Sequence, residues 1–481
     1  MIAPLFAVYV SAQTAGGLFE PGPQMNSTRI AIQVSQDDEG NVLLFGGRSV
    51  GFVSSAYADI YDVELNTFTN VNMLYPHDNA ILIRMSDGRF MLAGGGYDWG
   101  IPAYANIEIF DQETRSFSAG GNLLYPRMQG SGVELTSGKL LIVGGWYSPD
   151  AAAYPELYDP AAGTSASAGS LVIARSSALV LPCNDGGAVV VGGYPTYGGN
   201  CFAGAEYYDP TTNGFDWLTD ELVPEEPGFV TAMDNANKET PNLFQLPDGR
   251  YIFLAWRYDP EFEYALISFD PETKAFAKIE TDVPLMGELT DGGFVDIVVN
   301  RAAGLVYLLG LNADTGGGEI GLVTVDVSTG KVYQPSEVYV CPASTYLLYG
   351  NMAYIESTGK IMYAGVSATN ADYFNATTGT YWITPEFTVD VPEVAVSETF
   401  NVFPNPSNGN FRVQMDVTEP GSFTFSVTDV TGRSVYDAIY HAAVQGTFTW
   451  NVQLPALPQG YYHLLVHGNT AHYDRTIVIA E

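Results

Sequence analysis

The chain has 481 residues, 46% of them hydrophobic, which is enough for at least two domains with packed cores. Its formal net charge of −35 argues against nucleic acids and anionic membrane surfaces as partners, because both require basic patches. No apolar run beyond the N-terminus is long enough to cross a membrane as a helix, and three cysteines are too few for a disulfide framework.

Residues 1–12 are predicted to be a secretory signal peptide. They form an apolar stretch that ends in the small residues Val10-Ser11-Ala12, a pattern typical of a cleavage site. No basic residue precedes the apolar stretch, so the true start codon stays open.

A unit of nearly fifty residues repeats after this segment. Four apolar runs end in glycine pairs that are 48, 50 and 48 residues apart. The pairs end at Gly47, Gly95, Gly145 and Gly193, and the aromatic-Asp dipeptides that follow them are Tyr61-Asp62, Phe110-Asp111, Tyr158-Asp159 and Tyr208-Asp209. Together with the polar turns between them, these runs predict four antiparallel strands in each unit, which is the pattern of a propeller blade.

Three looser units follow, so the sequence predicts seven units between residues 14 and 382. Their turn glycines, each followed by an apolar strand, are Gly249, Gly304 and Gly359. Phe19 resembles the aromatic of a fourth strand and would complete the last unit, which would remove an exposed sheet edge. Tyr381 and Trp382 compete for the same role, so the sequence leaves the closure of the ring open.

The glycine pair, the aromatic-Asp dipeptide and the aromatic that follows resemble kelch repeats over residues 14–382. The resemblance implies an all-β protein with a seven-bladed kelch-type β-propeller. It implies little about function, because one fold supports many activities.

The composition changes at residues 383–398, a stretch with Pro and acidic residues that is predicted to be a linker. Residues 399–481 contain several short strands and are predicted to form a small β-sandwich. The motif residues of this segment are Pro404, Asn405, Pro406, Gly409, Asp429, Gly432, Gly460 and Tyr461. In this order they resemble the type A C-terminal sorting domain of the type IX secretion system. A carbohydrate-binding sandwich is the alternative.

The resemblance to a sorting domain implies a Bacteroidetes-type source. It also implies export across the inner membrane by the signal peptide, followed by passage through the outer membrane. The expected partner is therefore the outer-membrane secretion machinery, and the product is expected to be secreted or attached to the outer cell surface. Whether the sorting domain is then cleaved stays open.

Basic residues recur at one register of the repeat. Five of them stand eleven residues before a turn glycine: Arg29, His77, Arg127, Arg175 and Lys238. This register begins the innermost strand, so the side chains are expected to ring one mouth of a central channel. Long loops on the same face carry Trp99, Tyr104 and Tyr197.

Two interpretations of this basic ring are open. In the first, each basic side chain bonds loop carbonyls and packs its stem as part of the repeat. In the second, the ring is a funnel for an acidic glycan or an acidic segment of a protein partner, because Arg recognises carboxylates bidentately and aromatic rings stack on sugars.

No catalytic residue, metal site or cofactor is assigned from the sequence. His77 is the only histidine before residue 441, whereas a copper radical oxidase of the galactose oxidase kind, which shares kelch architecture, needs two histidines. No nucleophile elbow, P-loop or dinucleotide fingerprint is present. An extracellular glycan-active lyase or hydrolase and an adhesin-like structural protein stay as alternatives to a binding module.

Overall fold

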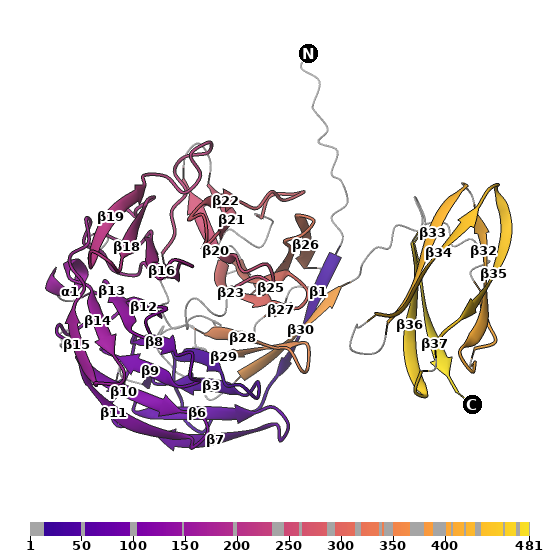
Figure 1. Cartoon of the computed structure of the whole chain (residues 1–481). Helices are drawn as coiled ribbons and strands as arrows, with labels where there is room; N and C mark the ends of the chain where they lie inside the picture. Colours follow the sequence, from indigo (N-terminus) through magenta and orange to yellow (C-terminus); the bar gives the residue numbers. More distant parts are fainter. Residues whose placement is uncertain are drawn as a thin grey trace, which may run out of the picture. The chain divides into compact units, whose positions relative to one another are not determined.

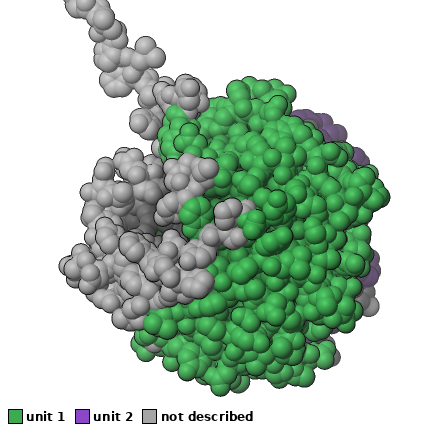
Figure 2. Space-filling view, turned by 90° about the vertical axis from the view of Figure 1, so that its left-hand side faces the viewer, with its two compact units in different colours: residues 1–389 green, residues 390–481 purple. Residues whose placement is uncertain are grey.

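The computed structural model forms two compact units, unit 1 (residues 1–389) and unit 2 (residues 390–481), which Figures 1 and 2 show. The residues that it describes are 14–49, 53–96, 103–146, 149–195, 200–232, 245–258, 262–285, 294–312, 319–335, 339–340, 350–365, 380–387, 401–405, 407–417, 420–428, 434–455, 457–467 and 472–480. Strands account for nearly all regular structure in these ranges, where α1 (Pro149–Ala153) is the one helix. The expected all-β class is confirmed.

Unit 1 begins with four antiparallel sheets of four strands, each made from one repeat. The first contains β2 (Gln33–Gln36), β3 (Val42–Phe45), β6 (Tyr57–Asp62) and β7 (Thr67–Asn72), and a small hairpin of β4 (Arg48–Ser49) and β5 (Val53–Ser54) follows β3. The second contains β8 (Ile81–Arg84), β9 (Phe90–Ala93), β10 (Asn106–Asp111) and β11 (Ser116–Asn122). The third contains β12 (Ser131–Glu134), β13 (Leu140–Val143), β14 (Glu156–Asp159) and β15 (Thr164–Ser167). The fourth contains β16 (Leu179–Pro182), β17 (Ala188–Val191), β18 (Ala205–Asp209) and β19 (Gly214–Thr219).

The later sheets of unit 1 are less regular. A three-stranded sheet contains β20 (Tyr251–Arg257), β21 (Glu263–Phe269) and β22 (Phe276–Lys278). A nine-stranded sheet contains β23 (Phe294–Asn300), β24 (Leu305–Asn312), β25 (Glu319–Asp326), β26 (Lys331–Pro335), β27 (Tyr339–Val340), β28 (Asn351–Ile355), β29 (Lys360–Ala364), β30 (Thr380–Phe387) and β1 (Thr14–Pro21).

The N-terminal strand β1 pairs antiparallel with β30 near the end of unit 1. Phe19 lies opposite Ile383 in this pair, whereas Tyr381 and Trp382 belong to β30 itself. The sequence left Phe19 and the Tyr381-Trp382 pair as candidates for completing the last unit. Of these, Phe19 lies on the strand that is added beside β30.

The sheets of unit 1 follow one another around a common centre, with their first strands innermost (Figure 1). The second strands β3, β9, β13 and β17 are buried along their whole length, because apolar clusters cover both faces of each. This explains why their sequences are continuous apolar runs instead of alternating ones. One further cluster joins the first sheet to β28 and β29, and it includes Val34 and Leu44 together with Ala353 and Met362.

The aromatic-Asp dipeptides stabilise the turn between the third and fourth strands. Asp62 and Asp111 each accept a backbone N–H of that turn, at 2.9 Å in both cases. The Tyr61 hydroxyl donates to Asn66, which sits in the left-handed region at φ 54°. The dipeptide recurs because the same turn must be closed in each unit.

The glycine pairs lie where consecutive units touch. Gly46 has φ +58°, and a Cβ there would lie 2.1 Å from the carbonyl oxygen of His77 in the next unit. The N–H of Gly47 donates to that same carbonyl at 2.7 Å. Only glycine combines this backbone conformation with so close an approach.

Unit 2 contains two sheets packed around one apolar core. The first contains β31 (Asn401–Phe403), β32 (Asn410–Val417) and β35 (Gly446–Gln453), and the second contains β34 (Ser434–Ala442), β33 (Gly421–Thr428), β36 (Gly460–His467) and β37 (His472–Ile479). Val413, Phe425 and Leu464 lie in the core between them.

Two sorting-motif residues, Asn405 and Gly409, connect the start of unit 2 to later segments of the same unit. The Asn405 side chain accepts the N–H of Val478 at 2.7 Å, and Gly409, at φ +93°, accepts the N–H of Leu454 through its carbonyl. Gly460 and Tyr461 open β36, which pairs with β37. Pro404 is exposed, whereas Pro406, Asp429 and Gly432 lie outside the described residues.

Candidate functional site

Four of the five predicted basic residues lie at equivalent places in the first four units. They are Arg29, His77, Arg127 and Arg175, and each is fully buried, with an exposed fraction of 0%. Each stands in the connection that leads to the first strand of its sheet. The register found in the sequence therefore brings them to one structural position.

The arginines bond backbone carbonyls of their own unit. Arg29 donates to the carbonyl of Gly46 at 2.6 Å, and Arg127 donates to that of Gly144 at 2.6 Å. Arg175 donates to the carbonyl of Gly192 at 3.1 Å. The acceptor is in each case the first glycine of the pair, so the basic side chain fixes the loop that follows the second strand.

Each basic side chain also faces a buried carboxylate from the third strand of its sheet. The pairs are Arg29–Asp59, His77–Glu108, Arg127–Glu156 and Arg175–Glu206. The four acids are buried as completely as their partners. We did not predict these acids, although the sequence signals them, because each stands two residues before the aromatic of an aromatic-Asp dipeptide.

The carboxylates have a second role in the connection between units. Glu108 accepts the N–H of Leu74 at 2.8 Å, and Glu206 accepts the N–H of Val172 at 2.7 Å. Each acid therefore joins the basic residue of its unit to the chain that enters the unit. A buried network of this kind ties the connection between units to the sheet.

His77 replaces the arginine in the second unit. Its Nδ1 lies 2.7 Å from the carbonyl oxygen of Gly94, and its Nε2 lies 3.0 Å from Oε1 of Glu108. Both ring nitrogens face acceptor oxygens of the protein. His77 thus takes the same two kinds of partner as the arginines.

Burial lowers the pKa of the arginines from their ordinary value. Desolvation is the main cause for Arg29 and Arg127, and the facing carboxylates offset part of it. Desolvation lowers the pKa of Arg175 to about 10. A buried guanidinium charge is costly unless it is paired, so each arginine requires its facing acid.

The fifth basic residue does not follow the pattern. Lys238 lies outside the described residues. At His77, Arg127 and Arg175 the backbone carbonyl accepts an N–H from the glycine pair of the preceding unit, but in the fifth unit a residue earlier in the chain than Lys238 supplies this carbonyl. The N–H of Gly193 donates to the carbonyl of Thr231 at 2.8 Å, as that of Gly145 does to the carbonyl of Arg175. The register of eleven residues therefore fails in the fifth unit.

The four described basic residues do not form an open funnel. Each of these four side chains is buried and faces a buried carboxylate, so a ligand could reach them only by displacing the carboxylates. Tyr104 is half-buried, and Trp99 and Tyr197 lie outside the described residues. The arrangement is that of the first interpretation, in which the basic side chain serves the repeat itself.

An aromatic stack extends from this ring to the surface at the fourth sheet. The Arg175 guanidinium lies 4.7 Å from the ring centroid of Phe202, and Phe202 packs on Trp217 at 5.3 Å between centroids. Trp217 is 40% exposed, and its indole N–H donates to Asp220 at 2.7 Å. Sequence reasoning missed this tryptophan because it lies on β19, outside the long loops.

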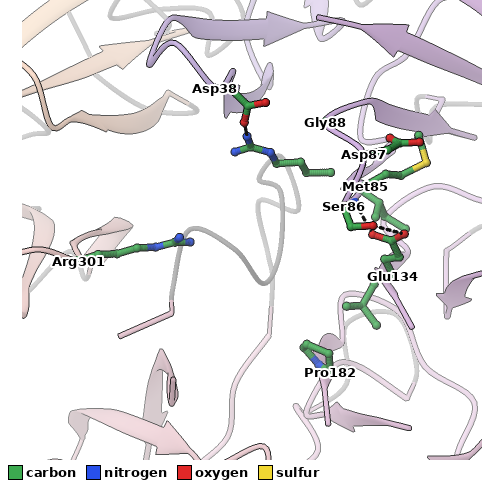
Figure 3. Close-up of a pocket in the computed structure, with 11 residues that line it drawn as sticks. Asp38, Met85, Ser86, Asp87, Gly88, Glu134, Pro182 and Arg301 are labelled. Atoms are coloured by element: carbon green, nitrogen blue, oxygen red, sulfur yellow. Dashed lines mark hydrogen bonds and ion pairs between the residues drawn. The ribbon is translucent and has the colours of Figure 1, made fainter. Parts of the chain in front are cut away.

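A cavity of about 510 Å³ lies at the other ends of the first strands (Figure 3). Residues at or just beyond the ends of β2, β8, β12, β16 and β23 line it. They include Asp38, Arg84, Glu134, Pro182 and Arg301. Strand ends from several sheets thus converge on one opening.

Comparison with known proteins identifies the C-terminal segment. Residues 401–480 match the family model of the secretion system C-terminal sorting domain, so this part of the predicted organisation is confirmed. The protein is accordingly secreted or attached to the outer cell surface, and its sorting domain interacts with the secretion machinery. In the described residues no helix is long and apolar enough to cross a membrane.

The whole chain is similar in fold to a solved oxidase. The structure is titled as a novel fungal alcohol oxidase of the AA5 family in complex with copper, and it has 14% sequence identity and a TM-score of 0.53. The match covers 98% of this chain and 100% of the oxidase chain. At this identity the likeness shows the fold alone. No curated protein matches the chain.

Copper does not fit the residues that the structure describes. Within the described ranges, no group of three or more His, Cys, Asp or Glu side chains is arranged to hold a metal ion. His77 is the only histidine of unit 1, and both of its ring nitrogens already face protein acceptors. We therefore derive no copper chemistry for this chain.

Proposed function

We propose that unit 1 is a seven-bladed kelch-type β-propeller that is exported to act as an extracellular glycan-binding module. Three observations support the propeller. One repeat makes one sheet in the first four units, the ends of first strands converge on one cavity, and an apolar cluster joins the first sheet to the last strands.

The binding role rests on Trp217. Its indole is held from beneath by Phe202 and at its N–H by Asp220, so it is fixed in place while 40% of its surface stays exposed. A rigid exposed aromatic face is suited to stacking on the apolar face of a sugar ring. The neighbouring Asp220 carboxylate can accept sugar hydroxyl groups.

The geometry argues for a ligand without a required negative charge. The basic groups that suggested an acidic glycan are buried and neutralised by their carboxylates. The polar group beside the exposed indole is an acid, Asp220. A neutral glycan therefore suits this face better than an acidic one.

A glycan array with the full chain tests the proposal. Trp217→Ala should weaken binding of the best ligand at least about tenfold, a loss equivalent to about 1.4 kcal/mol. The matched control is Leu65→Ala, a side chain that is 71% exposed in the turn between the third and fourth strands of the first sheet. The proposal fails if Trp217→Ala binds like the wild type, or if only strongly anionic glycans bind.

A further inference from the structure

The cavity of about 510 Å³ at the ends of the first strands, which we call the turn-side cavity, has a size typical of small-molecule sites. It lies away from Trp217, since the fourth strand that carries this residue runs toward the opposite ends of the sheets. The cavity is lined by charged side chains from several units. A ligand there would be independent of the glycan-binding face.

Two carboxylates at the cavity already have cationic partners. Asp38 forms an ion pair with Arg84, and Asp87 forms one with Arg89 at 2.7 Å. All four of these side chains are partly exposed. These pairs contribute little net charge to the opening.

Glu134 is held differently. Its carboxylate accepts the backbone N–H and the hydroxyl of Ser86, the latter at 3.0 Å. Both donors are neutral, so they orient the carboxylate without cancelling its charge. Glu134 therefore presents a fixed negative charge at one side of the cavity (Figure 3).

Arg301 reaches into the cavity from the opposite side (Figure 3). Its guanidinium carries five N–H donors, more than any single acceptor group can use. It can therefore hold a carboxylate in the cavity while it keeps its contacts with the protein.

We propose that the turn-side cavity binds a dipolar ligand whose carboxylate meets Arg301 and whose ammonium group meets Glu134. The two protein charges lie on opposite sides, so the charges of the ligand must be separated along its length. A short peptide with free termini and an elongated amino acid with a terminal amine both have this chemistry. A pure anion would meet the carboxylates of the cavity, and a pure cation would meet Arg301.

Isothermal titration of the full chain with triglycine tests this inference. Acetylating the amino terminus or amidating the carboxyl terminus of triglycine should each weaken binding at least about tenfold. A parallel titration with 6-aminohexanoate separates the two sources of the ligand. Binding of triglycine alone indicates peptide termini, and equal binding of both indicates any zwitterion of suitable length.

Variants assign the two ends of the ligand. Arg301→Gln should weaken triglycine about tenfold and leave the already weaker triglycine amide unchanged. Glu134→Gln, which keeps an acceptor for Ser86, should do the same for the acetylated peptide. Arg250→Gln is the matched control, because Arg250 lies in a similar turn but is paired with Asp248 and does not line the cavity.

The inference is overturned if blocked and free triglycine bind alike, if neither triglycine nor 6-aminohexanoate binds at millimolar concentration, or if Arg250→Gln weakens binding as much as Arg301→Gln. Thermal unfolding of each variant accompanies the titrations. An unchanged midpoint shows that a lost affinity is not a lost fold.

Discussion

Replacing Arg127 by Met tests whether the buried ring of basic residues serves the fold. The guanidinium donates to the carbonyls of Gly144, Ala151 and Tyr154, at 2.6, 3.1 and 3.1 Å, and it pairs with Glu156. Methionine fills part of the same volume but donates no hydrogen bond. The substitution therefore leaves the Glu156 charge buried without its partner.

The expected cost is large. Removing one member of a buried pair costs about 3–5 kcal/mol, because the remaining charge is desolvated without compensation. Both side chains of this pair have an exposed fraction of 0%, so solvent cannot screen the remaining charge. The matched control is Arg89→Met, whose pair with Asp87 is exposed and should contribute at most about 1 kcal/mol.

Equilibrium urea unfolding followed by tryptophan fluorescence measures both free energies of unfolding. Adding Glu156→Gln to Arg127→Met should restore part of the lost stability, because a neutral amide replaces the unpaired carboxylate and can still accept a backbone N–H. The reasoning is refuted if Arg127→Met costs no more than Arg89→Met, or if the double variant is less stable than the Arg127→Met single variant.

Three further predictions follow from local geometry. Gly46→Ala should destabilise the chain far more than Gly40→Ala in the same unfolding assay. A Cβ at Gly46 would lie 2.1 Å from a backbone carbonyl oxygen, whereas one at Gly40 would meet nothing within 4 Å. Equal losses of unfolding free energy would contradict this. The backbone hydrogen bonds to Asp111 lower its pKa in the folded state. Its stabilising contribution is therefore complete above the unfolded-state pKa near pH 4 and is lost as the pH falls through the lower folded-state pKa. Asp111→Asn should reduce the acid-dependent loss of stability, and an unchanged pH profile would refute the assignment. Burial raises the pKa of Cys183 to about 12. A thiol reagent at pH 8 should therefore modify the half-buried Cys201 before Cys183, as peptide mass mapping would show. Modification of Cys183 as early as Cys201 would contradict its burial.

The sequence was sufficient for features that each unit repeats within itself. The aromatic-Asp dipeptide predicts a closed turn, and Asp62 and Asp111 close it. The sorting motif predicts the domain that residues 401–480 match. Both signals are local, so neither requires knowledge of how distant segments meet.

The interpretation of the basic residues required information that their spacing does not contain. The register placed Arg127 and Arg175 at one structural position, yet it could not show what faced them. The pattern acid-x-aromatic-Asp identifies Glu156 and Glu206 in the sequence. In a chain with 54 acidic residues, however, a single acid at one position is a weak signal. The charge balance of a buried site depends on both members of each pair.

Long-range pairing limited the other predictions. Phe19 and the Tyr381-Trp382 pair were equivalent candidates by pattern, and only the pairing of β1 with β30 distinguishes them. In the fifth unit the carbonyl that accepts the N–H of the preceding glycine pair belongs to Thr231. The chain from Thr231 to the turn glycine Gly249 is longer than the chain from the basic residue to the turn glycine in the first four units. Counting back from Gly249 therefore reached Lys238 instead of Thr231.

A crystal structure of the full chain with the glycan that binds best on the array tests the central claim most directly. The account predicts a sugar ring stacked on the exposed face of Trp217, with the four buried basic–acid pairs unchanged. A sugar bound at Arg127 or Arg175 with Glu156 or Glu206 displaced would contradict it, because the ring would then be a ligand site and not part of the repeat.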